Sequence, residues 1–368
     1  MTERESPSSD GPDRLELVGC WLLSVALLST SFGVVWDVQW HDDVGPDTFF
    51  TAPHMLIYAA PTLAGLASVV IVLMRTGAWR ADPRSITAGR AVTVLGVFRA
   101  PVGFLVAGVG AAVELIYGMI DLWWHTVYGF DVTLNSPPHV GLSLGGLTIC
   151  VGAVLAFIAL GGRGITRWGL VLSVATSLTS MMFALFWAQP FEVSVTVVAL
   201  FALMLVAGVT RATGWVTLTG LIFGALHAID WFFAPWITRL YAESLGLSLR
   251  DNISGRPELA SLYPMVLPLI ALLVEVGLVV LRRRGLSPKA AIPAISAVAA
   301  LLMSLLYTPQ LGNGFSPLVI AIATALGAGA GPLGWSAAIS LRRLAPGADT
   351  QPAASTPSEP ALRPVMEV

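Results

Sequence analysis

Apolar runs of about twenty residues recur along most of the chain and are separated by shorter polar segments. A helix needs about 20 predominantly apolar residues to cross the hydrocarbon core of a bilayer. The pattern therefore predicts an all-α, polytopic integral membrane protein with about ten transmembrane helices. The predicted spans are roughly 16–40, 54–74, 101–124, 139–161, 168–188, 193–210, 214–234, 263–281, 290–308 and 316–340.

The polar segments predict how these spans are grouped. We expect a cytoplasmic N-terminal tail over 1–15, a four-span region over 16–161, and a six-span bundle over 162–343. The remaining residues, 344–368, are rich in Pro, Ala, Ser and Thr, which predicts a disordered tail. Between the second and third spans, 86–100 is expected to lie on the membrane surface as an interfacial helix.

The basic residues predict the orientation of the chain. If the N-terminus lies in the cytoplasm, only Arg239, Arg250 and Arg256 of the 20 Lys and Arg residues fall on the outer side. Positive charges concentrate on the cytoplasmic side of membrane proteins, so we expect both termini in the cytoplasm. The expected location is a bacterial-type inner (plasma) membrane. In this orientation all 5 histidines lie at the outer ends of helices.

Composition excludes a soluble enzyme, because hydrophobic residues make up 55% of the chain and charged residues only 11%. The expected partner is therefore the lipid bilayer. The net charge of −2 gives no reason to expect a nucleic-acid partner. The two cysteines, Cys20 and Cys150, lie inside apolar runs, which favours small core residues over a disulfide.

Two stretches in the first four spans repeat one pattern of Asp and His. The pattern is Asp, three residues, His, twelve or thirteen residues, and a second His that follows a proline. Its members are Asp37, His41 and His54 in the first copy and Asp121, His125 and His139 in the second. Two matched Asp-His-His sets predict two metal sites.

The spacing explains how each set could converge on an ion. An Asp and a His four residues apart share one face of a helix. The second His of each copy is expected to be the third residue of the next helix, after a cap at Thr51 or Ser136. The positive end of the helix dipole disfavours imidazolium there, which keeps the ring in the neutral form that binds metal. Two imidazoles and one carboxylate suit copper, iron or zinc.

Other acids lie close to the repeated pattern. The turns between the paired helices hold carboxylates that could support the ligands or attract cations, and these are Asp42, Asp43, Asp47 and Asp131. The alternative is that all these groups are merely hydrated beside interfacial tryptophans.

Three polar residues lie within or near the apolar spans. Glu114 is two helical turns before Asp121, about 10 Å deeper, and is a candidate proton donor, an extra ligand or a paired structural acid. His227 and Asp230 admit a functional and a structural role equally. Glu275 favours a structural role.

The Asp-x3-His-x12-His spacing resembles the copper-site motif in the membrane C subunit of particulate methane and ammonia monooxygenases. In that family a second site follows with Asn-x3-His-x13-His spacing, and Asp121 stands where the family has Asn. The resemblance covers about forty residues directly and the first four spans by extension. It implies copper as cofactor, other membrane subunits or an electron donor as partners, and a small apolar or weakly polar substrate. Nothing in this chain corresponds to the cupredoxin domains of the family's B subunit.

Two classes of function follow. The first is a copper-binding membrane protein with two adjacent sites near the outer leaflet, a component of a monooxygenase or oxidase in which Glu114 donates protons. The second is an ion- or proton-coupled transporter or sensor that uses the same carboxylates and histidines. Helices broken at mid-membrane would favour the second class. Bis-histidine haem binding fits less well, because it requires no carboxylates.

Overall fold

The computed structural model describes residues 13–45, 47–83, 90–129, 135–161, 164–312 and 316–345. Each predicted span is a helix in this structure. The helices are α1 (Arg14–Asp43), α2 (Ala52–Ala81), α3 (Val102–Tyr128), α4 (Pro137–Ala159), α5 (Ile165–Leu185), α6 (Phe191–Thr210), α7 (Trp215–Leu245), the short α8 (Glu258–Ser261), α9 (Leu267–Arg283), α10 (Pro288–Gln310) and α11 (Pro317–Leu341), followed by the 3-10 turn η1 (Arg342–Leu344). Asp131 lies outside the described residues, as does the predicted tail over 344–368 beyond residue 345.

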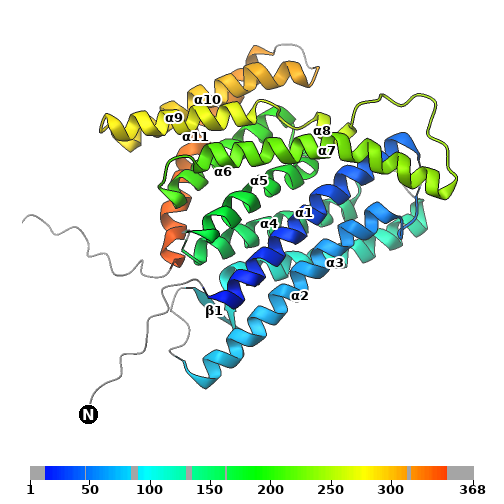
Figure 1. Ribbon diagram of the computed structural model, residues 1–368, viewed down its shortest axis with the longest axis horizontal. Helices are drawn as coiled ribbons and strands as arrows, with labels where there is room; N and C mark the ends of the chain where they lie inside the picture. Colours follow the sequence, from blue (N-terminus) through cyan, green and yellow to red (C-terminus); the bar gives the residue numbers. More distant parts are fainter. Residues whose placement is uncertain are drawn as a thin grey trace, which may run out of the picture.

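The structure is that of an all-α, multi-pass membrane protein. Within the described residues, 9 helices are long and apolar enough to cross a bilayer. The other two α-helices are shorter, α9 with 17 residues and α8 with 4. Figure 1 shows that α1 begins and α11 ends at the same end of the bundle. The predicted span over 263–281 corresponds to α9.

The segment between α2 and α3 corrects the sequence prediction. Its described part forms an antiparallel hairpin of β1 (Ala91–Val94) and β2 (Phe98–Pro101) instead of an interfacial helix. Leu95 and Gly96 both have positive φ, of 52° and 69°. This is the backbone of a tight hairpin turn, and the Val97 N–H donates to the carbonyl of Val94 across it. The β-branched residues on either side favour strands, which the helical reading of 86–100 overlooked.

Helix α7 also differs from the prediction, because it continues to Leu245 and not to about 234. Pro235 lies inside the helix without ending it. The extension is held against α1 by aromatic contacts, including Tyr241 with Trp36 and Trp40 at ring-centroid distances of 5.5 and 5.0 Å. As a result, His227 and Asp230 lie well inside α7 and not at its outer end.

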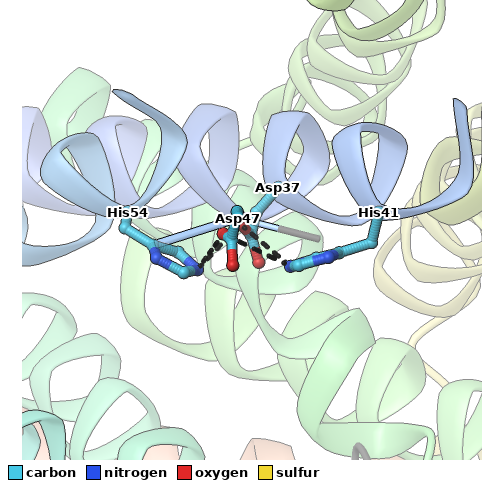
Figure 2. Close-up of side chains that lie close together, drawn as sticks. All are labelled: Asp37, His41, Asp47 and His54. Carbon is cyan, nitrogen blue, oxygen red and sulfur yellow. Dashed lines mark ion pairs between the residues drawn. The ribbon is translucent and has the colours of Figure 1, made fainter. Parts of the chain in front are cut away.

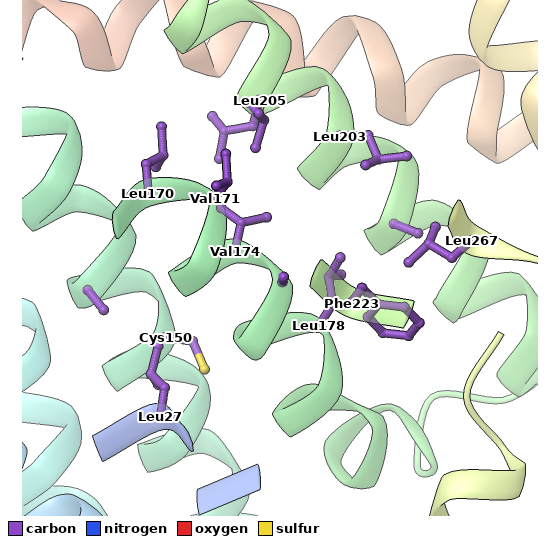
Figure 3. Close-up of a cluster of buried hydrophobic side chains, with 14 of the residues drawn as sticks. Leu27, Cys150, Leu170, Val171, Val174, Leu178, Leu203, Leu205, Phe223 and Leu267 are labelled. Carbon is purple, nitrogen blue, oxygen red and sulfur yellow. The ribbon is translucent and has the colours of Figure 1, made fainter. Parts of the chain in front are cut away.

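The apolar core gathers around α5. Figure 3 shows Leu170, Val174 and Leu178 of α5 among side chains of α1, α4, α6, α7 and α9. Cys150 belongs to this cluster, and both cysteines are buried and free, as predicted. Glu275 of α9 has a structural role: its Oε2 accepts hydrogen bonds from the N–H groups of Val216 and Thr217 and so caps the start of α7.

Helices α3 and α4 approach each other unusually closely because glycines lie between them. A Cβ added to Gly103 or Gly152 would lie 2.4 Å from a backbone nitrogen of the other helix. A Cβ on Gly145 would lie 2.7 Å from the backbone nitrogen of Glu114. Small residues at these positions let the two backbones meet, as is common in membrane bundles. The contact fixes the height of Glu114 against α4.

Candidate metal centre

The first Asp and His set converges at the turn between α1 and α2. Figure 2 shows the carboxylates of Asp37 and Asp47 between the rings of His41 and His54. The Nε2 of His54 lies 3.1 Å from an oxygen of each carboxylate. The Nε2 of His41 lies 3.7 Å from Asp37 and 3.6 Å from Asp47. The predicted face shared by Asp37 and His41 is therefore present.

These separations match the ligand shell of one ion. Ligand atoms about 2.1 Å from a tetrahedral ion lie about 3.4 Å from one another. The four distances, from 3.1 to 3.7 Å, bracket that value. The donor set of two imidazoles and two carboxylates fits zinc, copper or ferrous iron by ligand type. The arrangement can hold an ion without large movement of its side chains.

Backbone contacts orient His54 for this role. Its Nδ1 lies 3.1 Å from the carbonyl oxygen of Thr48. A carbonyl only accepts, so Nδ1 donates to it and Nε2 is the nitrogen that faces the carboxylates, where it could bind an ion that they share, as in many metal sites. Thr51 holds this turn through hydrogen bonds with the N–H and carbonyl of Thr48. Its side chain does not cap α2, which differs from the sequence prediction.

The second set forms a similar cluster at the turn between α3 and α4. The Nε2 of His125 lies 3.3 Å from Asp121, and that of His139 lies 3.6 Å from the other oxygen of the same carboxylate. Nδ1 of His125 lies 3.0 Å from the carbonyl oxygen of Gly129, which fixes the ring as Thr48 fixes His54. Ser136 caps α4 as predicted and accepts a hydrogen bond from the N–H of His139.

Asp47 is the ligand candidate that the sequence did not single out. The prediction placed it with three other turn acids as a supporting group. In the structure its side chain is fully buried and adjoins both histidines of the first set. In the second turn Asp131 lies two residues after a glycine, as Asp47 does in the first, but Asp131 is outside the described residues. The shared Gly-x-Asp pattern of the two turns was the signal that could have identified Asp47.

Both clusters line one cavity of about 360 Å³. The predicted sharing of a cavity by the two sets is therefore confirmed. Much of the remaining wall is apolar and is formed by Val34, Ile57, Leu142, Leu147, Met181 and Phe183. The volume lies at the lower end of the range for small-molecule sites. The cavity combines two clusters that could each hold an ion with a wall suited to a small apolar molecule.

Glu114 faces this cavity from below, as predicted. Its side chain is 3% exposed, and its Oε2 has no hydrogen-bond partner among the described residues. Gly146 of α4 makes room for the carboxylate, whose nearest oxygen would lie 3.6 Å from a Cβ at that position. Glu114 is not part of either cluster. The position suits a group that holds or passes a proton, and less well a ligand.

Tyr58 is a further cavity residue that the sequence analysis missed. It lies one turn after His54 on the same face of α2, with ring centroids 6.1 Å apart. Its hydroxyl is near enough to interact electrostatically with Asp37, Asp47 and Asp121. Tyr58 therefore lies between the two clusters. The four-residue spacing from His54 was the available signal.

The outer side of the cavity is covered by the segment between α7 and α8. Arg250 donates its backbone N–H to the carbonyl of Asp43 and a guanidinium N–H to that of Asp42. Glu258 lines the cavity, and its N–H donates to the side chain of Gln39. Burial raises the pKa of Glu258, and the nearby Asp42 raises it further. The cover therefore brings a carboxyl group to the cavity mouth.

Comparison with family models, with curated proteins and with solved structures finds no match for this chain. The geometry of the two clusters and their cavity therefore carries the functional argument.

Proposed function

We propose that this protein is a membrane metalloprotein that binds two metal ions in one cavity and takes part in an oxidation reaction. The observation that carries this proposal is the convergence of two Asp and His clusters on a single cavity. In each copy the candidate ligand atoms lie within 4.8 Å of one another, a spacing that fits one ion. The copper-site spacing described above favours copper over iron or zinc.

A reduced copper or iron ion bound there would supply oxygen-activating chemistry. The residues of the chain would perform the other tasks. Asp37, His41, Asp47 and His54 would hold one ion, and Asp121, His125 and His139 the other. The apolar wall would accommodate a small apolar or weakly polar substrate that arrives from the lipid. Glu114 would donate a proton inside the cavity, where bulk water is largely excluded.

An oxidation of this kind also needs electrons from a partner. We propose a redox protein or another membrane subunit in that role, acting at the outer face of a bacterial-type inner membrane. The clusters lie near the helix ends on that face. The transporter alternative is less favoured, because α1 to α4 are each continuous from end to end, without the unwound mid-membrane segments that commonly bind ions in transporters.

Metal analysis of the purified protein tests the proposal. We expect about two copper ions per chain, one for each cluster. Zinc or iron in the same amount would replace copper in the proposal, and absence of bound metal after supply of all three would overturn it.

The Glu114→Gln variant separates a proton donor from a ligand. It should retain both ions and lose oxygen consumption driven by an artificial electron donor. Loss of metal from this variant, to the extent seen for His125→Ala, would make Glu114 a ligand and contradict its assigned role.

A further inference from the structure

A second buried polar group lies in α7, away from the metal cavity. Asp230 has no exposed surface, and neither of its carboxylate oxygens has a hydrogen-bond partner among the described residues. It does not line the cavity that holds the two clusters. A buried carboxylate without a partner is costly in a membrane protein, so the site requires a bound species that offsets this cost.

The neighbours of Asp230 are neutral polar groups. The hydroxyl of Tyr263, which follows α8, is near enough to interact electrostatically with Asp230 and lies beside Ser31 of α1. His227 lies one turn before Asp230, with its ring centroid 5.4 Å from that of Tyr263. The Nε2 of His227 is buried and has no partner among the described residues. These groups could share hydrogen bonds with a protonated carboxyl.

Charged residues on the surrounding helices do not neutralise Asp230. On α9, Glu275 and Arg282 pair with each other near the start of α7. Glu275 caps Val216 there, about 21 Å along the helix from Asp230. Glu192 of α6 is near Tyr307 of α10. Near Tyr263, α1 and α5 contribute the hydroxyls of Ser31 and Thr179. A proton is therefore the smallest species that removes the buried charge.

A row of hydroxyls leads from this site toward the metal cavity. Ser31 donates to Thr179 of α5 at 2.9 Å, and both side chains are buried. Their chain neighbours, Thr30 and Ser180, line the cavity. Thr179 donates in turn to the carbonyl of Thr176, and the Tyr263 hydroxyl has no hydrogen-bond partner among the described residues, so it can turn toward either Asp230 or Ser31. Hydroxyl groups both donate and accept hydrogen bonds, which is what proton passage requires.

We propose that Asp230 is a buried proton-binding site and that Tyr263, Ser31 and Thr179 connect it to the cavity. Asp230 carries the proton as a neutral carboxylic acid. Proton exchange moves one proton along the hydroxyls in each direction, so no charge is left behind. This site does not depend on metal binding and exists in the metal-free protein.

Infrared spectroscopy of the purified, metal-stripped protein tests the site. At neutral pH the wild type should show a protonated carboxyl C=O band that is lost in Asp230→Asn and kept in the surface variant Asp251→Asn. Tyr263→Phe should shift the frequency of this band, which provides a second measurement if Asp230→Asn does not fold. An unchanged carboxyl region in Asp230→Asn would overturn the proposal, as would disappearance of the band on addition of sodium or zinc ions.

Transfer to D2O tests the connection. Deuteration shifts the C=O band, so the rate of the shift reports proton exchange at Asp230. Ser31→Ala should slow it by roughly a factor of ten, the effect of losing one hydrogen bond of the path. The matched control is Ser24→Ala, which removes another hydroxyl pair between α1 and α5, Ser24 with Ser173 at 3.0 Å. Equal rates in Ser31→Ala and Ser24→Ala would overturn the connection. If the native protein binds no metal but still shows the carboxyl band, the proposed metal function fails and the proton site at Asp230 stands.

Discussion

The hairpins α1–α2 and α3–α4 carry the same Asp and His spacing in different surroundings. In both, the last turns of one helix and the first turn of the next bring two Nε2 atoms near one carboxylate. The inner ends of α1 and α2 are joined by ion pairs of Arg75 with Asp13 and Glu16. Helices α3 and α4 instead meet along glycines. The ligand geometry is therefore independent of how each pair of helices is held together.

Equivalent positions also show where the two copies diverge. Thr30 precedes Asp37 by the same seven residues by which Glu114 precedes Asp121, so the two positions are equivalent. Both side chains line the cavity. Tyr58 and Ser143 are also equivalent, because each lies four residues after the second histidine of its copy. Both line the cavity as well. The deep acid thus comes from the second hairpin and the phenol from the first. Repetition supplies the two clusters, whereas substitution at the equivalent positions makes the cavity asymmetric.

Loss of one histidine from each copy should produce the largest effect. His41→Ala and His125→Ala should each lower the metal content by about one ion, and the double variant should bind none, because each cluster loses an imidazole that the other cannot replace. Metal analysis of the purified variants measures this. His227→Ala is the control, since its ring lies outside the cavity lining, and it should keep both ions. Loss of both ions from a single variant would show that the two clusters are not independent.

The Asp47→Asn variant tests whether the first cluster has a fourth ligand. It removes a carboxylate charge beside both histidines. Metal binding at the first cluster should weaken by about 10- to 100-fold, which is the loss seen even when a group that only supports a metal ligand is removed. Competition with a chelator measures the affinity. Asp43→Asn is the matched control, because Asp43 accepts a hydrogen bond from Gln39 and belongs to neither cluster. Equal affinities in these two variants would return Asp47 to the supporting role assigned from the sequence.

Neighbouring glycines of α4 test the packing difference. In Gly145→Ala the new Cβ would meet the backbone of Glu114 at 2.7 Å, so α3 and α4 must separate, at a cost of about 1–3 kcal/mol in the free energy of unfolding. In Gly146→Ala the nearest atom is a carboxylate oxygen at 3.6 Å, so stability should change little. Thermal unfolding in detergent, followed by circular dichroism, measures both. A larger loss in Gly146→Ala would contradict the close contact of the two backbones.

Sequence periodicity predicts the helices and the two clusters well, because both depend on regular spacing. Asp37 and His41 share a face as a result of helical geometry alone. The selection of Asp47 over Asp42 and Asp43 depends on the path of the turn, which no period specifies. The continuation of α7 beyond Pro235 depends on its contacts with Trp36 and Trp40, which are distant in sequence. Metal identity does not follow from helical periodicity or from the distances, and copper is favoured only by the resemblance of the spacing to a known copper-site motif.

The smallest expected effect concerns the ion pair of Asp13 with Arg75 in the first hairpin. Burial raises the pKa of Asp13, but the hydrogen bond and charge of Arg75, with the N–H groups of Leu15 and Glu16, outweigh it and leave the pKa below its usual value of 3.8. A carboxyl with a lowered pKa in the folded state stabilises the fold above that usual value. The stabilisation is lost as the pH falls through the lowered pKa. Asp13 is partly exposed, so solvent and salt screen the pair and the effect is small.

Asp13→Asn should therefore lower the unfolding temperature slightly at pH 7 and low salt. The difference from the wild type should shrink at high salt and vanish in acid, where Asp13 is protonated in both the folded and unfolded states. Thermal unfolding across this pH range measures it, with the exposed Asp251→Asn variant as the control for a general loss of charge. A difference that persists unchanged in acid would mean that Asp13 stabilises α1 as a neutral helix cap, through the N–H groups of Leu15 and Glu16. The charge interaction of Asp13 with Arg75 would then contribute nothing. The inner ends of the two hairpins would then both be held by uncharged contacts, and the contrast between them would be one of packing alone.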